Sequence, residues 1–362
     1  MFRLRSMESY VAHVSREMDD ALRRARSGGA GGARARFDIA TDRMIIFGDL
    51  HRGARNAADD FRQNERAYCA ALAYYFRMGH RLVVLGDAEE LWEESPATIL
   101  SEYRHTLELE AQFHRDGRYC RVWGNHDDEW QYEPRVRLLL DPIYGGRPLN
   151  IYEALFVDVE DDGNRLGSLF LVHGHQGDTK SSQWSWLSRR VIRYLWRPFQ
   201  RFTGASVNTP ATSWDLRDRL NQAMYAWSVK EKSLLLVASH THEPVFKSRS
   251  HEAQIKEHLA ALEAEAGKVP SREQREEMAR LQARLEWVRM KTQESGGQRN
   301  GIHFQLPCYF NPGCCCYDDG DITGIELAEG QIRLIRWPDE DNEPCPHILA
   351  ADSLREVFRD CS

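Results

Sequence analysis

From residue 37 onwards, short apolar runs alternate with stretches in which apolar residues recur at helical spacing. The apolar runs are 44–47, 82–85 and 119–123, and the helical stretches between them are 61–78 and 97–116. Strands that alternate with helices in this way are typical of βαβ units around a buried sheet. We therefore predict an α/β fold. Each predicted strand ends in polar residues, at the edge where open sheets bind ligands.

The second half of the chain has a pattern that predicts antiparallel strands. Two pairs of apolar runs, 154–159 with 168–172 and 322–327 with 332–337, are each separated by a short turn that contains glycine. Such pairs are typical of β-hairpins. With a further predicted strand at 234–238, they indicate that parallel and antiparallel strands occur together in this chain.

The N-terminal residues have a pattern of their own. Apolar residues at helical spacing predict a helix over 6–26, and the sequence GGAGG at 28–32 predicts a flexible linker after it. No apolar stretch typical of a secretory signal occurs there, and no run in the chain approaches the roughly 18–20 residues of a membrane span. We therefore divide the chain into a helix with linker at 1–36, a main domain at 37–338 and a C-terminal tail at 339–362.

The segment 179–232 is the most basic part of the chain. It holds ten lysines and arginines and three acids, a net charge of +7, whereas the whole chain carries −7. Within it, residues 184–202 predict a kinked amphipathic helix that places Arg193 and Arg197 on one stripe beside Trp196. Basic helices with aromatic residues are typical of membrane surfaces and of sites for anionic lipid-like ligands. A helix packed on the core with its arginines in water is the alternative.

Residues 252–293 predict a second insertion into the main domain. The segment is rich in Glu, Ala, Arg and Leu and is interrupted at Gly267-Lys268-Val269-Pro270. Apolar positions on each side of this interruption recur at helical spacing, so we predict a helical hairpin. Its apolar stripes can pack against each other, against the core or against a second subunit, which makes a homo-oligomer one expectation.

The cysteine content bears on the cellular compartment and on metal binding. Eight cysteines in 362 residues are too few for a disulfide scaffold, and no CxxC pair occurs. We therefore expect reduced thiols in a cytoplasmic protein. Three cysteines are consecutive, Cys314, Cys315 and Cys316, which allows a soft-metal or redox site. Adjacent strand residues point to opposite faces, so a shared metal is awkward and a structural role is favoured.

Five polar clusters follow predicted strands and contain the residue types that bind metals. They are Asp49-Leu50-His51, Gly86-Asp87, Gly124-Asn125-His126-Asp127, His173-Gly174-His175 and Ser239-His240-Thr241-His242. Because strand side chains alternate, Asp49 and His51 should project to one side, and so should His240 and His242. Together the clusters hold three carboxylates, one amide and six imidazoles, of which two carboxylates, the amide and four or five imidazoles are candidate ligands. Such a set can hold two divalent cations with one bridging carboxylate.

In chain order these clusters read GDLH, GDAEE, GNHDD, VHGHQGD and SHTHEP. The ordered set resembles the motifs of the calcineurin-like metallophosphoesterase family, over roughly residues 44–245. The resemblance implies a four-layer α/β/β/α sandwich of two mixed sheets, with the helical cap at 179–232 and the helical hairpin at 252–293 as insertions. It also implies a hydrolase of phosphoester or pyrophosphate bonds that uses two divalent metal ions. Mixed oxygen and nitrogen ligands suit Mn²⁺, which we expect, as well as Fe or Zn²⁺.

The resemblance further implies a role for each residue of these motifs. It implies that the first metal is bound by Asp49, His51 and His242. The second metal is bound by Asn125, His173 and His240, and Asp87 bridges the two. It makes His126 the catalytic histidine that faces the leaving group, with Asp127 as the hydrogen-bond partner that sets its tautomer. One departure is Ser239, where the family has glycine, so the turn there has to accommodate a side chain.

The substrate is less constrained than the metal ligands. Candidate substrate contacts are Arg52, His175, Arg193 and Arg197. In position and character the basic segment resembles the helical cap of UDP-2,3-diacylglucosamine pyrophosphatases, which implies an anionic lipid-linked or nucleotide substrate and a peripheral membrane contact through residues 184–202. One alternative is a metal-dependent nuclease, although the net charge of −7 makes nucleic acid a less favoured partner. The other is a non-catalytic scaffold, which would have no need of a complete ligand set.

Overall fold

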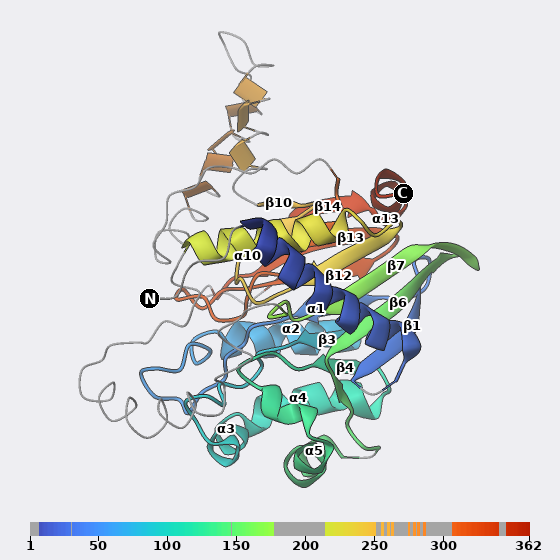
Figure 1. Ribbon diagram of the computed structural model, residues 1–362. Helices are drawn as coiled ribbons and strands as arrows, with labels where there is room; N and C mark the ends of the chain where they lie inside the picture. Colours follow the sequence, from blue (N-terminus) through green and yellow to red (C-terminus); the bar gives the residue numbers. More distant parts are fainter. Residues whose placement is uncertain are drawn as a thin grey trace.

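The structure is a computed structural model with two main sheets and flanking helices (Figure 1). It describes residues 7–29, 31–145, 147–176, 214–250, 306–339 and 345–362, together with short stretches between 255 and 286. Two short strands, β9 (Val245–Phe246) and β10 (Arg249–Ser250), form a separate pair beside β11. In the described part of the chain, no helix is long and apolar enough to cross a membrane.

The first sheet has five strands and combines parallel with antiparallel pairs. Its order is β1 (Gly32–Asp38), β6 (Ala154–Asp161), β7 (Asn164–Val172), β8 (Leu234–Ala238) and β11 (Tyr309–Phe310). β6 and β7 form the antiparallel hairpin that the sequence predicts. The pairs β1 with β6, β7 with β8 and β8 with β11 are parallel.

The second sheet has seven strands and a parallel half. Its order is β14 (His347–Ser353), β13 (Gln331–Trp337), β12 (Ile322–Ala328), β2 (Met44–Phe47), β3 (Arg81–Leu85), β4 (Tyr119–Val122) and β5 (Ile151–Tyr152). The strands β2 to β5 pair in parallel, whereas β14, β13, β12 and β2 pair antiparallel. The predicted mixed sheets are therefore confirmed.

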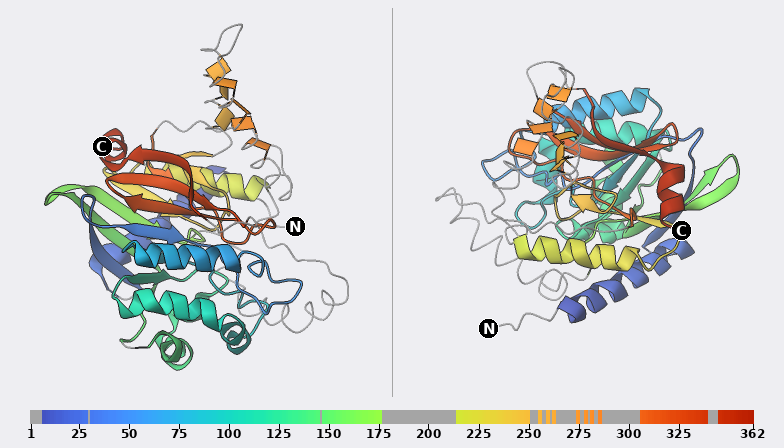
Figure 2. Two further views of the ribbon diagram at one scale, coloured as in Figure 1. Left: turned by 180° about the vertical axis from the view of Figure 1, so that it is seen from behind. Right: turned by 90° about the horizontal axis from the view of Figure 1, so that it is seen from above.

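Helices cover the outer face of each sheet. α1 (Met7–Ser27) and α10 (Trp214–Ser228) lie side by side over the first sheet, and α2 (Glu65–Arg77) and α4 (Arg104–Arg115) lie over the second (Figure 2). The shorter helices are α3 (Pro96–Glu102), η1 (Asp128–Gln131), α5 (Glu133–Leu139), α6 (Asp141–Tyr144) and α13 (Leu354–Asp360). The helix predicted over 97–116 is thus two helices, α3 and α4, which meet at Tyr103.

Alternate residues of the strands pack into different cores, and this alternation builds the layers. On β2, Ile45 and Phe47 belong to the core formed with α2 and α4, whereas Met44 and Ile46 belong to the core between the two sheets. The residues of β7 divide in the same way, between the inter-sheet core and a third core beneath α1 and α10. The three cores therefore lie between α2 with α4 and the second sheet, between the two sheets, and between the first sheet and α1 with α10.

The flexible linker predicted at 28–32 is wrong. Gly32 N–H donates to Gly29 O at 3.0 Å, so the chain turns tightly after α1, and residues 32–38 then continue as β1. α1 itself is held on the first sheet by buried side chains that include Met18 and Leu22. The helix is thus an integral layer of the fold, because its apolar stripe has a sheet to cover.

The prediction of a C-terminal tail at 339–362 is also wrong for the residues that the structure describes. Residues 347–353 form β14, the edge strand beside β13, and α13 follows directly. Leu354, Val357 and Phe358 of this helix are buried in the inter-sheet core. The C-terminal residues therefore close one end of the space between the sheets.

The two predicted insertions are described only in part. Residues 177–213, which hold most of the predicted cap, lie outside the described residues, and the rest of the cap includes α10. In the predicted hairpin the described positions are helical. They bury together the apolar residues Ile255, Leu281 and Leu285, with Leu259 and Leu262 against them. The two stripes therefore contact each other, and a contact with a second subunit stays a prediction.

Candidate metal centre

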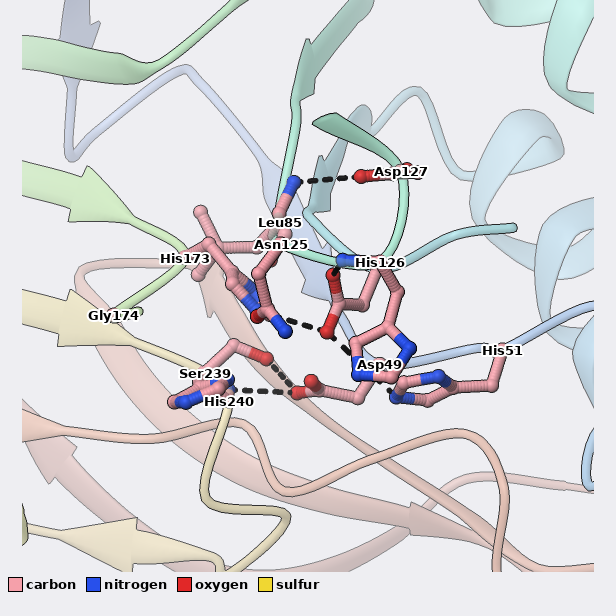
Figure 3. Close-up of polar contacts among 12 residues, drawn as sticks. Asp49, His51, Leu85, Asn125, His126, Asp127, His173, Gly174, Ser239 and His240 are labelled. Carbon is pink, nitrogen blue, oxygen red and sulfur yellow. Dashed lines mark hydrogen bonds and ion pairs between the residues drawn. The ribbon is translucent and has the colours of Figure 1, made fainter. Parts of the chain in front are cut away.

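Loops that follow β2, β3, β4, β7 and β8 bring the predicted ligands together at one edge of the two sheets (Figure 3). The loops carry the acids, amide and histidines of the five polar clusters. These side chains form two groups of three whose ligand atoms lie within 4.8 Å of one another: Asp49, His51 and His242 in one, Asp87, His173 and His240 in the other. The structure thus brings together residues from five separate segments of the chain.

The first group is formed by one carboxylate and two imidazoles. Nε2 of His51 lies 3.2 Å from Nε2 of His242, and Nε2 of His242 lies 3.4 Å from Oδ1 of Asp49. Oδ1 of Asp49 is buried and accepts no hydrogen bond from the described residues. A cation between these atoms would satisfy that oxygen and would explain why two imidazole nitrogens face each other.

The second group is organised around His173. Nδ1 of His173 lies 3.0 Å from the carbonyl oxygen of Leu85, to which it donates, so Nε2 is the ring nitrogen that faces the group. That Nε2 lies 3.1 Å from Oδ2 of Asp87 and 3.2 Å from Oδ1 of Asn125. His240 completes the group with Asp87 and His173. The ring of His173 is therefore oriented as a metal ligand requires.

Asp87 lies between the two groups. Its Oδ2 is 3.1 Å from Nε2 of His173 and 3.8 Å from Nε2 of His51. Its Oδ1 accepts the backbone N–H of His126 at 2.8 Å, which fixes the orientation of the carboxylate. One carboxylate thus faces ligands of both groups, as a bridge between two cations would.

The carboxylates of the site favour positive charge at two of its imidazoles, His51 and His242. Burial lowers the pKa of His51, but Glu90 and Asp87 raise it to about 10, and burial likewise lowers the pKa of His242, but Asp49 raises it to about 9. Although burial raises the pKa of Asp49, His242 brings it down to about 2. The carboxylates therefore stabilise positive charge at these nitrogens, and a metal cation supplies such charge in place of protons.

The backbone conformation of the ligands differs from the sequence prediction. Asp49 and His51 lie after the end of β2, with φ values of 49° and 52°, and His240 and His242 lie after β8, with φ values of 69° and 55°. Strand alternation is therefore the wrong reason for their common direction, because all four residues are left-handed. Asp87 is left-handed too, with φ of 48°. Such backbone strain is concentrated at functional sites, where the surrounding structure has to hold it.

Two residues near Asp49 and His173 explain how these loops fit together. Ser239 occupies the turn without a positive φ, and its hydroxyl and the N–H of His240 donate to Oδ2 of Asp49. The side chain at this position is therefore accommodated and adds a hydrogen bond. At Gly86, with φ of 83°, a Cβ would lie 2.5 Å from Nδ1 of His173, so only glycine fits.

His126 has a different partner from the one predicted. Its Nδ1 lies 2.6 Å from Oε2 of Glu90, and its ring stacks on Trp92 with centroids 4.0 Å apart. Nδ1 of His51 lies 3.1 Å from the same Glu90 oxygen. Burial raises the pKa of Glu90, but these two histidines bring it down to about 2, so the carboxylate is ionised. Glu90 therefore links the first ligand group to His126.

The predicted hydrogen bond between Asp127 and His126 is wrong. The Asp127 carboxylate lies away from the ring and accepts the backbone N–H groups of Gly124 at 2.6 Å and Ala88 at 3.0 Å (Figure 3). Burial raises its pKa to about 6 despite the neighbouring Arg121. Asp127 thus ties the loop after β4 to the loop after β3. The sequence offered a signal for the true partner, because Glu90 stands three residues after Asp87.

Arg52 is not a substrate contact. Its side chain is fully buried and forms ion pairs with Glu89 at 2.8 Å and Glu110 at 2.6 Å. Glu89 also pairs with Arg121, and Glu110 accepts from the hydroxyl groups of three tyrosines. The arginine therefore belongs to a buried polar network beneath the site, where it neutralises two carboxylates.

The Arg52→Met variant should be destabilised by about 3–5 kcal/mol, because it leaves the buried Glu110 carboxylate without its cation and leaves Glu89 with Arg121 alone. Chemical denaturation followed by circular dichroism measures this change. Arg62→Met, which alters an exposed arginine nearby, is the control and should change stability by less than about 0.5 kcal/mol. Unchanged stability of Arg52→Met together with a raised KM would instead make Arg52 a substrate contact.

The other predicted substrate contacts are His175, Arg193 and Arg197, of which the structure describes only His175. The ring of His175 lies 5.3 Å from that of His173 and 5.2 Å from that of Trp123, measured between centroids. It is thus beside the second ligand group, and its contact with substrate stays a prediction. Arg193 and Arg197 lie outside the described residues.

Two groups of acids and imidazoles at strand ends of a two-sheet sandwich are typical of metal-dependent hydrolases. The chain belongs to the calcineurin-like phosphoesterase family, whose model matches residues 43–244, so the predicted family is confirmed. Twelve chains of solved structure are similar to this one. Among them is vacuolar protein sorting 29 from Cryptosporidium parvum, with 11% identity and a TM-score of 0.31 over 86% of this chain and 98% of that chain. No curated protein matches the chain.

Proposed function

We propose that this protein hydrolyses phosphoester or pyrophosphate bonds with two divalent metal ions. The observation that carries the proposal is the position of Asp87, whose Oδ2 faces His173 in one ligand group and His51 in the other. A single bridging carboxylate between two sets of oxygen and nitrogen ligands is what a two-metal hydrolase requires. The family to which the chain belongs supports the same reaction.

Asp49, His51 and His242 would hold the first ion, Asn125, His173 and His240 the second, and Asp87 both. When bound, two such ions supply positive charge for the phosphoryl oxygens and lower the pKa of a water molecule. Mn²⁺ is the ion we propose first, with Fe and Zn²⁺ as alternatives, because mixed oxygen and nitrogen ligands suit all three. Metal analysis of the purified protein tests both the number and the identity of the ions.

His126 would act on the leaving group. Its Nδ1 lies 2.6 Å from the ionised carboxylate of Glu90, so Nδ1–H donates a hydrogen bond to Glu90, which orients the ring. The stacked indole of Trp92, which donates from Nε1 to the carbonyl oxygen of Asn125 at 2.7 Å, restrains the ring from one face. The remaining nitrogen, Nε2, is then the atom that can give a proton to the leaving oxygen.

We propose an anionic amphiphile as the substrate, on the strength of the basic segment 184–202. Its arginines are interleaved with large apolar residues, and burial of one such side chain contributes about 1.5–3 kcal/mol, a contribution that salt changes little. Arg193→Ala/Arg197→Ala and Trp196→Ala/Phe199→Ala should therefore both lose activity on an amphiphilic pyrophosphate and binding to anionic vesicles. Activity on a small soluble phosphodiester should persist in both pairs. If neither pair changes vesicle binding or KM for an amphiphile, the lipid proposal fails.

A screen of purified protein with Mn²⁺ tests the substrate class directly. It compares mononucleotides, cyclic nucleotides, nucleotide-sugar lipids and single-stranded DNA at several salt concentrations. Preference for the lipids supports the proposal. We also propose that the protein is cytoplasmic and contacts membranes through residues 184–202. Preference for DNA with a steep loss of binding in salt supports the nuclease instead, because each neutralised phosphate releases counterions. Metal binding without turnover of any phosphoester would contradict the hydrolase.

A further inference from the structure

The cysteine run lies against a histidine of the first ligand group. Sγ of Cys316 is 3.7 Å from Nδ1 of His242. The ligand atoms of His242, Cys314 and Cys316 all lie within 4.8 Å of one another, and Cys314 is buried. Two sulfur atoms and an imidazole nitrogen therefore converge at one point, beside a centre that otherwise consists of oxygen and nitrogen ligands.

The backbone holds the cysteine run in a fixed position. Cys315 N–H donates to the carbonyl oxygen of Asp49 at 3.1 Å, and Thr323 N–H donates to the carbonyl oxygen of Cys314 at 3.0 Å. The run is thus fixed between the loop after β2 and the start of β12. Cys315 turns its own thiol away, into the core beneath α2, so Cys314 and Cys316 share the side that faces His242. Adjacent cysteines would point to opposite sides, but Cys314 and Cys316 are two residues apart and can therefore bind the same ion.

The two nitrogens of His242 face different surroundings. Nε2 faces Oδ1 of Asp49 at 3.4 Å and Nε2 of His51 at 3.2 Å. Nδ1 faces the sulfur of Cys316 at 3.7 Å. A metal-bound histidine ordinarily donates its second N–H to a carboxylate, a carbonyl oxygen or water. At that place His242 has two soft sulfur atoms, which are ligands that Zn²⁺ prefers.

We propose that His242, Cys314 and Cys316 form a separate site for a thiophilic divalent ion such as Zn²⁺, and that His242 bridges this ion to the oxygen and nitrogen centre. With Zn–S near 2.3 Å and Zn–N near 2.0 Å, tetrahedral ligand atoms lie about 3.5–4 Å apart, which the observed 3.7 Å matches. Binding displaces a proton from each thiol and from Nδ1. Three protein ligands leave a fourth position for water or a substrate group.

The inference depends on the proposed function only through the shared His242, and spectroscopy separates the two. Metal-free protein is titrated with Co²⁺ under a non-thiol reductant. Cobalt bound by thiolates has a charge-transfer absorption in the near ultraviolet, whereas cobalt in either site has visible ligand-field bands. We expect both kinds of band in the unaltered protein. Cys314→Ala/Cys316→Ala should lose the ultraviolet band and bind one Zn²⁺ fewer per chain, whereas the matched control Cys315→Ala should keep both properties.

The spectrum of the unaltered protein decides the question even if the double variant fails to fold, which circular dichroism detects. Visible bands without the ultraviolet band would overturn the thiolate site and leave the proposed hydrolytic centre intact. An ultraviolet band that persists in Cys314→Ala/Cys316→Ala but disappears in Cys315→Ala would also overturn it. If the protein shows the ultraviolet band but binds only one Co²⁺ per chain, the thiolate site is supported and the two-metal centre is contradicted.

Discussion

Asp87→Asn should lose most of both metal ions from the purified protein. The Asp87 carboxylate faces His173 at 3.1 Å and His51 at 3.8 Å, and the amide keeps its shape but removes its charge. We expect a loss of affinity greater than the roughly 10–100-fold that results from changing a residue outside the ligand set. Elemental analysis of the unaltered protein should find up to two ions per chain in this centre, and activity should disappear with them.

Asp162→Asn is the matched control, because Asp162 lies in the exposed turn between β6 and β7. It should retain full metal content and activity. Asp87→Asn should remain folded by circular dichroism, since the charged contacts of this carboxylate are with the imidazoles of the site. Full occupancy of both ions in folded Asp87→Asn would contradict the bridging role, even if activity were lost.

The parallel half of the second sheet could be predicted because its strands are short, apolar and sharply ended. β2 and residues 82–85 of β3 are buried on both faces, so no polar residue interrupts these runs, and Gly48, Gly86 and Gly124 follow the ends of the runs. Burial on both faces is the usual condition of parallel strands, and it leaves a continuous apolar run in the sequence. The break between α3 and α4 could not be predicted in this way.

That break depends on tertiary contacts. Tyr103 lies between the two helices with its ring buried, and its hydroxyl donates to Oδ2 of Asp59 at 2.7 Å. The apolar spacing continues through the break, so a single long helix was predicted. β1 was missed for a related reason: only Ala33, Ala35 and Phe37 of GARARFD face inward, and the preceding glycines resemble a linker.

The ligand set could be predicted from motif order, whereas the contacts around it could not. The family resemblance implied a hydrogen bond between His126 and Asp127. In the structure the backbone N–H groups of Gly124 and Ala88 take up the Asp127 carboxylate. Arg52 follows His51 directly in the sequence, yet its side chain lies in the buried network with Glu89. Charge and proximity in sequence do not reveal which side of a loop a side chain takes.

His126→Ala should retain the metal ions and lower kcat by about 10²–10⁴-fold, the usual contribution of a general acid. His126 belongs to neither ligand group proposed here, and its Nδ1 is directed to Glu90 at 2.6 Å. The variant removes the ring that Trp92 stacks on but leaves Asp87, His51 and His173 in place. Loss of both metals on His126→Ala would instead make the ring a ligand.

Glu90→Gln should lower kcat less than His126→Ala does, and it should add little to the loss in the double variant, because the two residues act as one unit. A purely structural role for the pair would not depend on the substrate. We therefore expect the loss to be small for an aryl phosphodiester, whose leaving oxygen needs little protonation, and large for an alkyl phosphodiester. Equal losses on both substrates, with the metals retained, would show that His126 positions the phosphate rather than donating a proton to the leaving oxygen.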